Sequence, residues 1–375
     1  MTSHFIMLRK SRLTWSKSND HIFKVVIYSL SAVILLSLTF NTIKSDKVEI
    51  EIEFEKLSEN ASFGPRDHES IVQYGTQIYV YGGFFRGGSA YQELLRSSDY
   101  GLSWIRLLGN EKPRLNDLET TILGVDSDLP SAFARFLEWN SSLYLVDSSL
   151  WQLENQNLIK VKDNFFEEIE SASELNILYT KTGVVLIDLS IGKLWVLNKE
   201  LKLTLSKELK FQGKTLRVRG ATVFENHGSF FIYGGELLGK GSQGTSMINN
   251  LSLKSIDGIN WLPIENSPQQ KNGFPFSKFI WSCTVNDSKG RTWVIGGYDL
   301  QNAENTSFVW VSLDGIKFSV VPINVKDDIF SPRHALGCVY LEEQKSILII
   351  GGKGGLEVTN DKSWVLNDIW YLKLL

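Results

Sequence analysis

Arginine, lysine and histidine recur in four short segments, each just ahead of a predicted strand. The segments are GPRDH (64–68), LRVRG (216–220), PFSKF (275–279) and SPRHA (331–335). A guanidinium group offers five donors in a planar fork, a geometry that suits anionic groups. Gathered at one place, these side chains would form a site for an anionic or polyhydroxylated ligand. The candidates are Arg66, His68, Arg219 (with Arg217 as its alternative), Lys278, Arg333 and His334.

A second group of polar residues follows paired glycines or stands beside them. It consists of Arg86, Glu236, Tyr298, Asp299 and Lys353. A carboxylate such as Glu236 or Asp299, placed beside Arg66 and Arg333, could act as the acid or base of an enzyme. The alternative for the arginines is structural, because their donors can also hold the carbonyls of neighbouring loops.

Recognised catalytic motifs do not stand out. The sequence has no GxSxG, HExxH or P-loop, and no GxGxxG between a strand and a helix. Two cysteines and five scattered histidines do not make a zinc site, so we expect no metal and no cofactor. The net charge of −3 excludes a general nucleic-acid-binding surface, which needs excess positive charge.

The N-terminal region contains a long uncharged apolar stretch. Residues 25–43 lie between Lys24 and Lys44 and are close in length to a membrane-spanning helix. A buried core helix and a cleaved signal peptide are the alternatives. Basic residues precede the stretch and acidic ones follow it. The positive-inside rule then places residues 1–24 in the cytoplasm and the rest outside, in the periplasm if the source is bacterial.

One phrase recurs along the remaining chain: an apolar strand that ends in two glycines. It occurs as IYVYGG (78–83), FFIYGG (230–235), TWVIGG (292–297) and LIIGG (348–352). Glycine adopts positive φ cheaply and lets neighbouring backbones come close. The glycines are Gly82, Gly83, Gly234, Gly235, Gly296, Gly297, Gly351 and Gly352.

These four segments resemble kelch repeats, whose period is about 50 residues. The resemblance implies a β-propeller similar to the central domain of galactose oxidase, in which each repeat is one four-stranded blade. Two degenerate repeats fit between the first and second glycine pairs. We therefore expect an all-β, six-bladed propeller over residues 48–375. Its blades are expected near 63–108, 130–163, 165–210, 213–265, 275–323 and 332–375.

Three further expectations follow from this architecture. The alternating segment 48–57 should supply the fourth strand of the last blade and close the ring. Asp99, Gly101 and Trp104 resemble the Asp-box of sialidases and should stabilise a turn. Cys283 and Cys338 fall at equivalent places of adjacent blades. We expect two buried apolar thiols there, and a disulfide is the alternative in an oxidising compartment.

Loops that lead into the first strand of each blade, and loops after the glycines, should lie on one face. We therefore expect a membrane-anchored propeller that presents this face to a glycan or protein partner as a binding or scaffolding module. A role in cell-envelope polysaccharide metabolism is a further expectation. The alternative is a carbohydrate-active enzyme, a glycosidase or one resembling the six-bladed N-acetylneuraminate epimerases, with its site at the mouth of the central channel.

Overall fold

The second of two units of the chain, Ile50–Leu375, contains everything that the structure describes. The computed structural model describes residues 50–85, 90–109, 128–165, 174–238, 247–248, 251–264, 278–323, 330–354 and 365–375. Every regular element in these ranges is a β-strand. None of them contains a helix long and apolar enough to cross a membrane. The anchor predicted at 25–43 lies outside the described residues.

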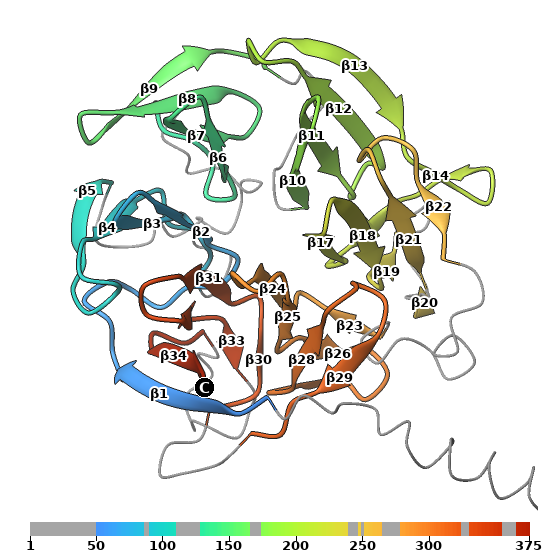
Figure 1. Ribbon diagram of the computed structural model, residues 1–375. Coiled ribbons are helices and arrows are strands. Elements are labelled where there is room, and N and C mark those ends of the chain that lie inside the picture. The colour runs from blue at the N-terminus through green and yellow to red at the C-terminus, as the bar shows by residue number, and fades with distance from the viewer. Residues whose placement is uncertain are drawn as a thin grey trace, which may run out of the picture. The chain divides into compact units, whose positions relative to one another are not determined.

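Six four-stranded antiparallel sheets, numbered here as blades 1 to 6, surround a common axis in the described part of the chain (Figure 1). Blade 1 contains β2 (Ser70–Tyr74), β3 (Gln77–Tyr81), β4 (Leu94–Ser97) and β5 (Ile105–Leu108). Blade 2 contains β6 (Arg135–Trp139), β7 (Ser142–Val146), β8 (Leu150–Glu154) and β9 (Asn157–Lys162). Blade 3 contains β10 (Leu175–Thr180), β11 (Gly183–Asp188), β12 (Lys193–Leu197) and β13 (Leu203–Glu208).

The remaining blades follow the same plan, with the first strand nearest the axis. Blade 4 contains β17 (Thr222–Asn226), β18 (Ser229–Tyr233), β21 (Ser252–Ser255) and β22 (Leu262–Pro263). Blade 5 contains β24 (Cys283–Asn286), β25 (Thr292–Ile295), β28 (Val309–Ser312) and β29 (Phe318–Val320). Blade 6 contains β31 (Gly337–Leu341), β32 (Ser346–Ile350), β34 (Ile369–Leu374) and β1 (Ile52–Ser58). This arrangement is a β-propeller.

Short strand pairs extend the blades on the face where the chain enters the first strands. In blade 4, β16 (Val218–Arg219) pairs with β19 (Glu236–Leu237), which pairs with β20 (Met247–Ile248). In blade 5, β23 (Phe279–Ile280) pairs with β26 (Tyr298–Asp299), which pairs with β27 (Glu304–Asn305). In blade 6, β30 (Arg333–His334) pairs with β33 (Lys353–Gly354). The hairpin of β14 (Lys210–Phe211) and β15 (Lys214–Thr215) follows blade 3.

The hydrophobic core is divided among the junctions between neighbouring blades. Six apolar clusters are found among the described residues, and each joins two adjacent blades, including blades 6 and 1. In β32, Ile347 and Ile349 contact blade 5, whereas Leu348 and Ile350 contact blade 1. A second strand is therefore buried on both faces. This explains why its sequence is continuously apolar instead of alternating.

Strand β1 closes the ring from the opposite end of the chain. It pairs antiparallel with β34, with Ile52 opposite Leu374 and Lys56 opposite Trp370. The last residue, Leu375, donates its amide to the Glu51 carbonyl at 3.1 Å. The sheet that begins near the end of the chain is thus completed by residues from the beginning of the unit. This is the pairing that the alternation in residues 48–57 predicts.

The paired glycines bring each blade against the segment that leads into the next. Gly82 has φ of 72°, and a Cβ at this position would lie 2.1 Å from the Ala132 carbonyl oxygen. Gly83 donates its amide to the same carbonyl at 2.9 Å. The Gly352 amide bonds to the Arg66 carbonyl at 2.9 Å in the same way. A larger residue would push the two backbones apart, so glycine is required for sterics as well as for φ.

The Asp-box-like turn stabilises the connection between the third and fourth strands of blade 1. Asp99 Oδ1 accepts hydrogen bonds from Ser97 Oγ at 2.8 Å and from Ser103 N at 2.9 Å. The Trp104 indole donates to the Gly101 carbonyl at 3.0 Å. Two similar turns in blades 4 and 5, which have one residue fewer between the aspartate and the glycine, are SIDGINW (255–261) and SLDGIKF (312–318). Asp257 and Asp314 form hydrogen bonds there in a similar pattern. All these contacts are internal to the turns, which agrees with a structural role.

Candidate functional site

The segments that lead into the first strands are joined by backbone hydrogen bonds around the axis. Trp281 donates its amide to the Gly220 carbonyl at 2.9 Å, and Ala335 donates to the Trp281 carbonyl at 2.8 Å. His68 donates to the Ala335 carbonyl at 2.9 Å. These bonds connect blade 4 to blade 5, blade 5 to blade 6, and blade 6 to blade 1. They hold the lead-in segments at a fixed spacing.

Charged side chains extend this line into the two blades that lack paired glycines. In blade 2, Arg135 Nη1 donates to the His68 carbonyl at 3.1 Å. Ahead of blade 3, Glu174 Oε2 accepts from the Gly220 amide at 2.7 Å. Arg135 and Glu174 also attract one another electrostatically. We call these residues the collar: Gly220, Trp281, Ala335, His68, Arg135 and Glu174.

Four collar residues share an unusual backbone conformation. The φ angles are 59° at His68, 55° at Trp281, 52° at Ala335 and 66° at Gly220. Residues with side chains rarely occupy this left-handed region, yet three do so here at the same place in successive blades. The repetition indicates that the ring imposes the conformation. Strained backbone of this kind tends to gather at functional sites.

Trp281 stands at the centre of a group of rings on the collar. The indole is half-buried and stacks on His334, with 5.4 Å between centroids. His68 meets it edge-on at 5.5 Å, and the Arg219 guanidinium lies 5.7 Å from its centroid. Trp281 Nε1 also donates to Glu174 Oε1 at 3.4 Å. An aromatic surface is therefore surrounded by groups that donate or accept hydrogen bonds.

Burial changes the protonation of the acidic and basic groups at the collar. It raises the pKa of Glu174, although hydrogen bonds from the Gly220 amide and the Trp281 indole act in the opposite direction. Burial also lowers the pKa of Arg135, against the attraction of Glu174 and Glu69. Both shifts have the same main cause, because loss of solvation on burial disfavours the charged form of each group.

His334 is a neutral aromatic partner and not a cation. Its ring lies 5.4 Å from that of Tyr298, and its Nδ1 is 2.5 Å from Asn305 Oδ1. Burial, with smaller contributions from the charges of His68 and Lys353, lowers the pKa of His334 to about 3. The imidazole is therefore uncharged at neutral pH.

Arg66 was expected to face a ligand, and that expectation is wrong because its side chain is fully buried. It forms an ion pair with Glu93, and its Nη1 and Nε donate to the carbonyls of Gly82 and Gly64 at 3.0 and 3.2 Å. The guanidinium also lies 4.4 Å from the ring centroid of Tyr91. The structural alternative is correct for this arginine.

Arg333 repeats the arrangement in blade 6, so the same correction applies. Its side chain is fully buried and makes two hydrogen bonds to Asp368, at 2.6 and 2.8 Å. Nη1 and Nε donate to the carbonyls of Gly351 and Ser331 at 3.0 and 3.1 Å. The ring of Phe330 lies 4.4 Å from the guanidinium. Both arginines fasten the lead-in of a blade to its own third strand.

The other predicted cations form ion pairs on the same face. Arg219 Nε lies 2.5 Å from Glu236 Oε2, across the β16–β19 pair. Lys278 Nζ lies 2.5 Å from Asp299 Oδ2. The structure thus brings predicted residues together in twos, cation with carboxylate, and does not form the predicted ring of positive charge. Arg86 lies outside the described residues.

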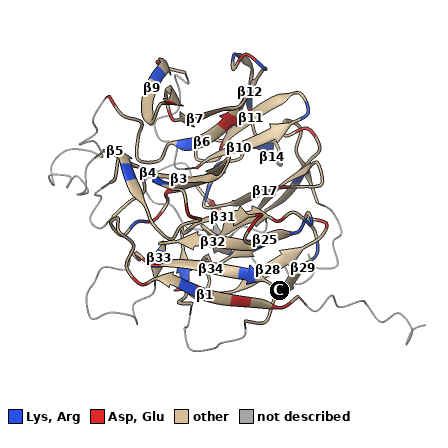
Figure 2. Ribbon diagram, turned by 60° about the vertical axis from the view of Figure 1, so that its left-hand side comes forward, with Lys and Arg blue, Asp and Glu red and all other residues tan. Residues whose placement is uncertain are grey.

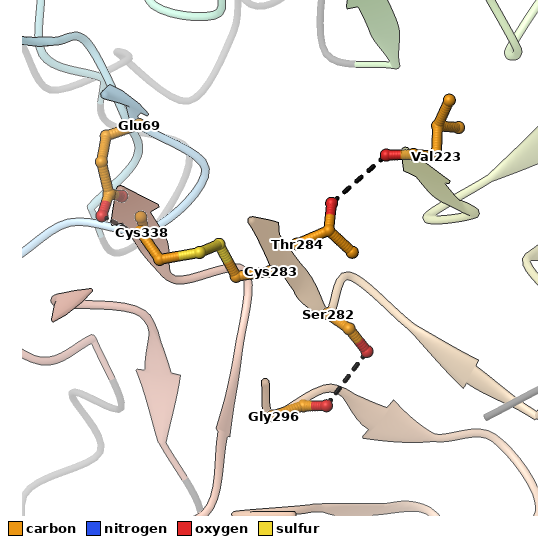
Figure 3. Close-up of a disulfide and its surroundings, with 8 residues drawn as sticks. Glu69, Val223, Ser282, Cys283, Thr284, Gly296 and Cys338 are labelled. Atoms are coloured by element: carbon orange, nitrogen blue, oxygen red, sulfur yellow. Dashed lines mark hydrogen bonds between the residues drawn. A yellow bond between two sulfur atoms is a disulfide. The ribbon is translucent and has the colours of Figure 1, made fainter. Parts of the chain in front are cut away.

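Cys283 and Cys338 form a disulfide between the innermost strands of blades 5 and 6 (Figure 3). Their Cα atoms are 6.2 Å apart. The expectation of two buried free thiols is therefore wrong, and the alternative is correct. The bridge lies close in sequence to the Trp281 and Ala335 collar bond, so it reinforces the same junction. Nearby, Glu69 Oε1 accepts from the amide of Gly337 at 2.9 Å.

Basic and acidic residues are interspersed along the strands and loops in the view of Figure 2. Within the described ranges, no group of three or more histidine, cysteine, aspartate or glutamate side chains could hold a metal ion. Together, the collar and the adjoining His334 offer an indole, two imidazoles and charged groups that form hydrogen bonds. This set suits recognition of a polar ligand that carries some apolar surface.

Four residues near the axis were missed by sequence reasoning: Trp281, Glu174, Arg135 and Glu69. A signal for the first was available, because Trp281 precedes its first strand by two residues, as His68 does. Placing the segments that lead into the first strands in one register would have aligned them. The others lie in lead-ins or first strands whose roles depend on contacts with other blades.

Comparison with known proteins supports the fold and goes no further. No family model matches the chain, and no curated protein matches its sequence. A solved structure described as "Structure of YjhT" is similar, with a TM-score of 0.51 and 10% sequence identity. The similarity covers 84% of this chain and 96% of that one. At this identity the likeness shows a shared fold alone, and the kelch resemblance stays a prediction.

Proposed function

We propose that this protein is a membrane-anchored, extracytoplasmic kelch-type propeller that binds a glycan on the collar face. The observation that carries the proposal is the position of Trp281, half-buried between His334 and His68 with Arg219 over its ring. A sugar ring offers C–H surface to an aromatic face and hydroxyls to the polar groups around it. The part of the half-buried indole that stays exposed, with the polar groups around it, would supply both kinds of partner.

The disulfide supports a location outside the cytoplasm. Such bonds persist in oxidising compartments and are rare in the cytosol, where thiols are kept reduced. The bridge between Cys283 and Cys338 is thus compatible with the orientation inferred from the charges around residues 25–43. The membrane anchor itself rests on the sequence.

Trp281→Ala tests the binding site. The full-length protein should bind members of a panel of soluble oligosaccharides. W281A should bind the same sugars at least about tenfold more weakly, because the indole that contacts the sugar ring is gone. Leu262→Ala is the control, since Leu262 is an exposed apolar residue on the outer strand β22. Wild-type and W281A proteins that bind the same sugars equally well would contradict the proposal.

An enzymatic role is the second candidate, and one observation favours it. Glu174 and Glu69 are buried carboxyls with raised pKa values, and both interact electrostatically with Arg135. Perturbed carboxyls of this kind are often the acids or bases of active sites. The version based on Arg66 and Arg333 has no support, because both are buried in ion pairs. Incubating the bound sugars with the protein and looking for products by mass spectrometry and NMR separates an enzyme from a binding module.

A further inference from the structure

Most of the predicted lysines and arginines near the collar are neutralised within the protein. Among the described residues, four form ion pairs with carboxylates: Arg66 with Glu93, Arg219 with Glu236, Lys278 with Asp299, and Arg333 with Asp368. The fifth, Lys353, lies opposite His334 in the β30–β33 pair. An anionic group must lose water to enter a partly buried site, and a cation without a carboxylate partner is the strongest compensation for that cost. Most of the positive charge that could bind an anionic ligand is already paired with carboxylates of the protein.

Arg219 lies over the ring of Trp281 and shows this neutralisation directly. Its side chain is 48% exposed, and its Nε is 2.5 Å from the carboxylate of Glu236. The guanidinium also lies over Trp281. An anion approaching Arg219 would therefore meet the negative charge of Glu236, whereas a hydroxyl could accept from one of the remaining donors without repulsion.

The inner collar has the same balance. Arg135 is attracted by Glu174, while burial raises the pKa of Glu69 to about 8 and keeps that carboxyl protonated at neutral pH. Each oxygen of Glu174 accepts one hydrogen bond, from the Gly220 amide and from the Trp281 indole. A carboxylate oxygen has two lone pairs, so each can accept one more bond from a hydroxyl donor. An additional carboxylate or phosphate at this place would instead be repelled by Glu174.

We infer that the glycan recognised by the collar face is uncharged, and that Glu236 sets this preference by neutralising Arg219 beside Trp281. The inference rests on the proposed function, because it names the ligand class of that same site. The ligand class is a neutral oligosaccharide of hexoses or N-acetylhexosamines. Oligosaccharides carrying carboxylate or sulfate groups are disfavoured.

Isothermal titration with matched oligosaccharides tests the preference. The probes are soluble chains of equal length, one set uncharged and the other containing uronic or sialic acids or sulfate esters. The full-length protein should bind an uncharged chain at least about tenfold more tightly than its acidic counterpart, with little change between low and high salt. Tighter binding of the acidic chain, or an affinity that falls steeply with salt, overturns the inference and leaves glycan binding intact. Failure to bind any member of either set overturns the proposed function itself.

Glu236→Gln provides a gain-of-function test that a purely structural role would not pass. The substitution keeps the shape and an acceptor oxygen while removing the charge, so Arg219 becomes available to an anion. E236Q should bind the acidic chains several-fold more tightly than wild type, with a new dependence on salt. Glu208→Gln is the matched control, because Glu208 is 57% exposed on the outer strand β13 of blade 3. An unchanged preference in a folded E236Q protein overturns the role assigned to Glu236.

Discussion

At the scale of single residues, Glu69 is a buried carboxyl whose surroundings favour its neutral form. It lies at the junction of blades 1 and 6, where its Oε1 accepts from the amide of Gly337. The other oxygen, Oε2, is buried and has no hydrogen-bond partner. Burial raises the pKa of Glu69 to about 8, despite the opposing attraction of Arg66. The folded protein therefore keeps this proton at neutral pH.

Glu69→Gln should change how stability depends on pH. The pKa of a glutamate in the unfolded chain is about 4.3. Between that value and about 8 the unfolded state has lost the proton and the folded state retains it, so rising pH lowers the free energy of unfolding. The amide introduced by E69Q cannot ionise but can still accept from Gly337. The advantage of E69Q over wild type should grow by on the order of a few kcal/mol from pH 5 to pH 8, measured by urea denaturation. A difference independent of pH would show that Glu69 is not protonated in the fold.

The buried arginines show what residue types alone could not reveal. Arg66 follows Phe-Gly-Pro and Arg333 follows Phe-Ser-Pro, so the same local pattern identifies both arginines in the sequence. Their partners, Glu93 and Asp368, lie 27 and 35 residues further along the chain. Both acids come immediately before a third strand, so the pairing appears only when the strands are in register. The local sequence therefore identifies the arginines as candidates. It does not show whether each one contacts a ligand or a carboxylate of the protein.

At the scale of elements, β1 depends on a small set of apolar contacts. Ile52 is almost fully buried in the cluster between blades 5 and 6. The ring of Phe54 stacks on Phe330 at 4.4 Å and meets Trp370 edge-on at 6.3 Å. Without β1 these apolar surfaces and the hydrogen-bonding edge of β34 would be exposed. An open edge of this kind also invites aggregation.

Deleting residues 48–57 should therefore unfold or aggregate the propeller. The loss should remove the cooperative thermal transition seen by circular dichroism, and size-exclusion chromatography should show aggregates. Replacing Glu53 and Glu55 with serine, on the same strand, is the control and should leave the transition nearly unchanged, since both side chains are partly exposed at the rim. A deletion variant that remains monomeric and melts like wild type would show that β1 is dispensable.

Periodic elements were predictable because their signals are local. A second strand buried on both faces must be continuously apolar, and the turn after it needs glycine, so both features recur at the period of the blade. The pattern is weaker in blades 2 and 3, where Asp147 and Asp188 take the place of the first glycine. Asp147 accepts from the Ser149 amide at 2.7 Å and holds the turn with its side chain. The collar was not predictable in the same way, because each of its bonds joins different blades.

At the scale of the whole molecule, the disulfide is a covalent link between two blades. It joins residues separated by 55 positions, so it restricts a large loop in the unfolded chain. Replacing Cys283 and Cys338 together by serine should lower the free energy of unfolding by about 2–4 kcal/mol. Denaturant titration under oxidising conditions measures this loss. Adding a reducing agent should destabilise wild type and leave the double variant unaffected.

The double variant also reports on the collar. The bridge lies beside the bond between Trp281 and Ala335, so its loss should weaken the protection of the Ala335 amide against hydrogen exchange more than that of the His68 amide at the next junction. If loss of the disulfide changes the protection of the Ala335 amide no more than that of the His68 amide, the disulfide acts on the unfolded chain alone.

Strand β1 has a mechanical consequence. Any load applied to the chain ahead of Ile50 enters the propeller through β1, whose backbone is paired with β34 from Ile52 to Ser58. A pull along the strand is shared by all the pairs at once, whereas a pull across it breaks them one after another. Because Glu51 and Leu375 are hydrogen-bonded, a domain fused to the C-terminus would load the same ladder from its other side. The two ends of the propeller therefore share one point of mechanical loading. A force applied to either end acts on the β1–β34 pairing that closes the ring.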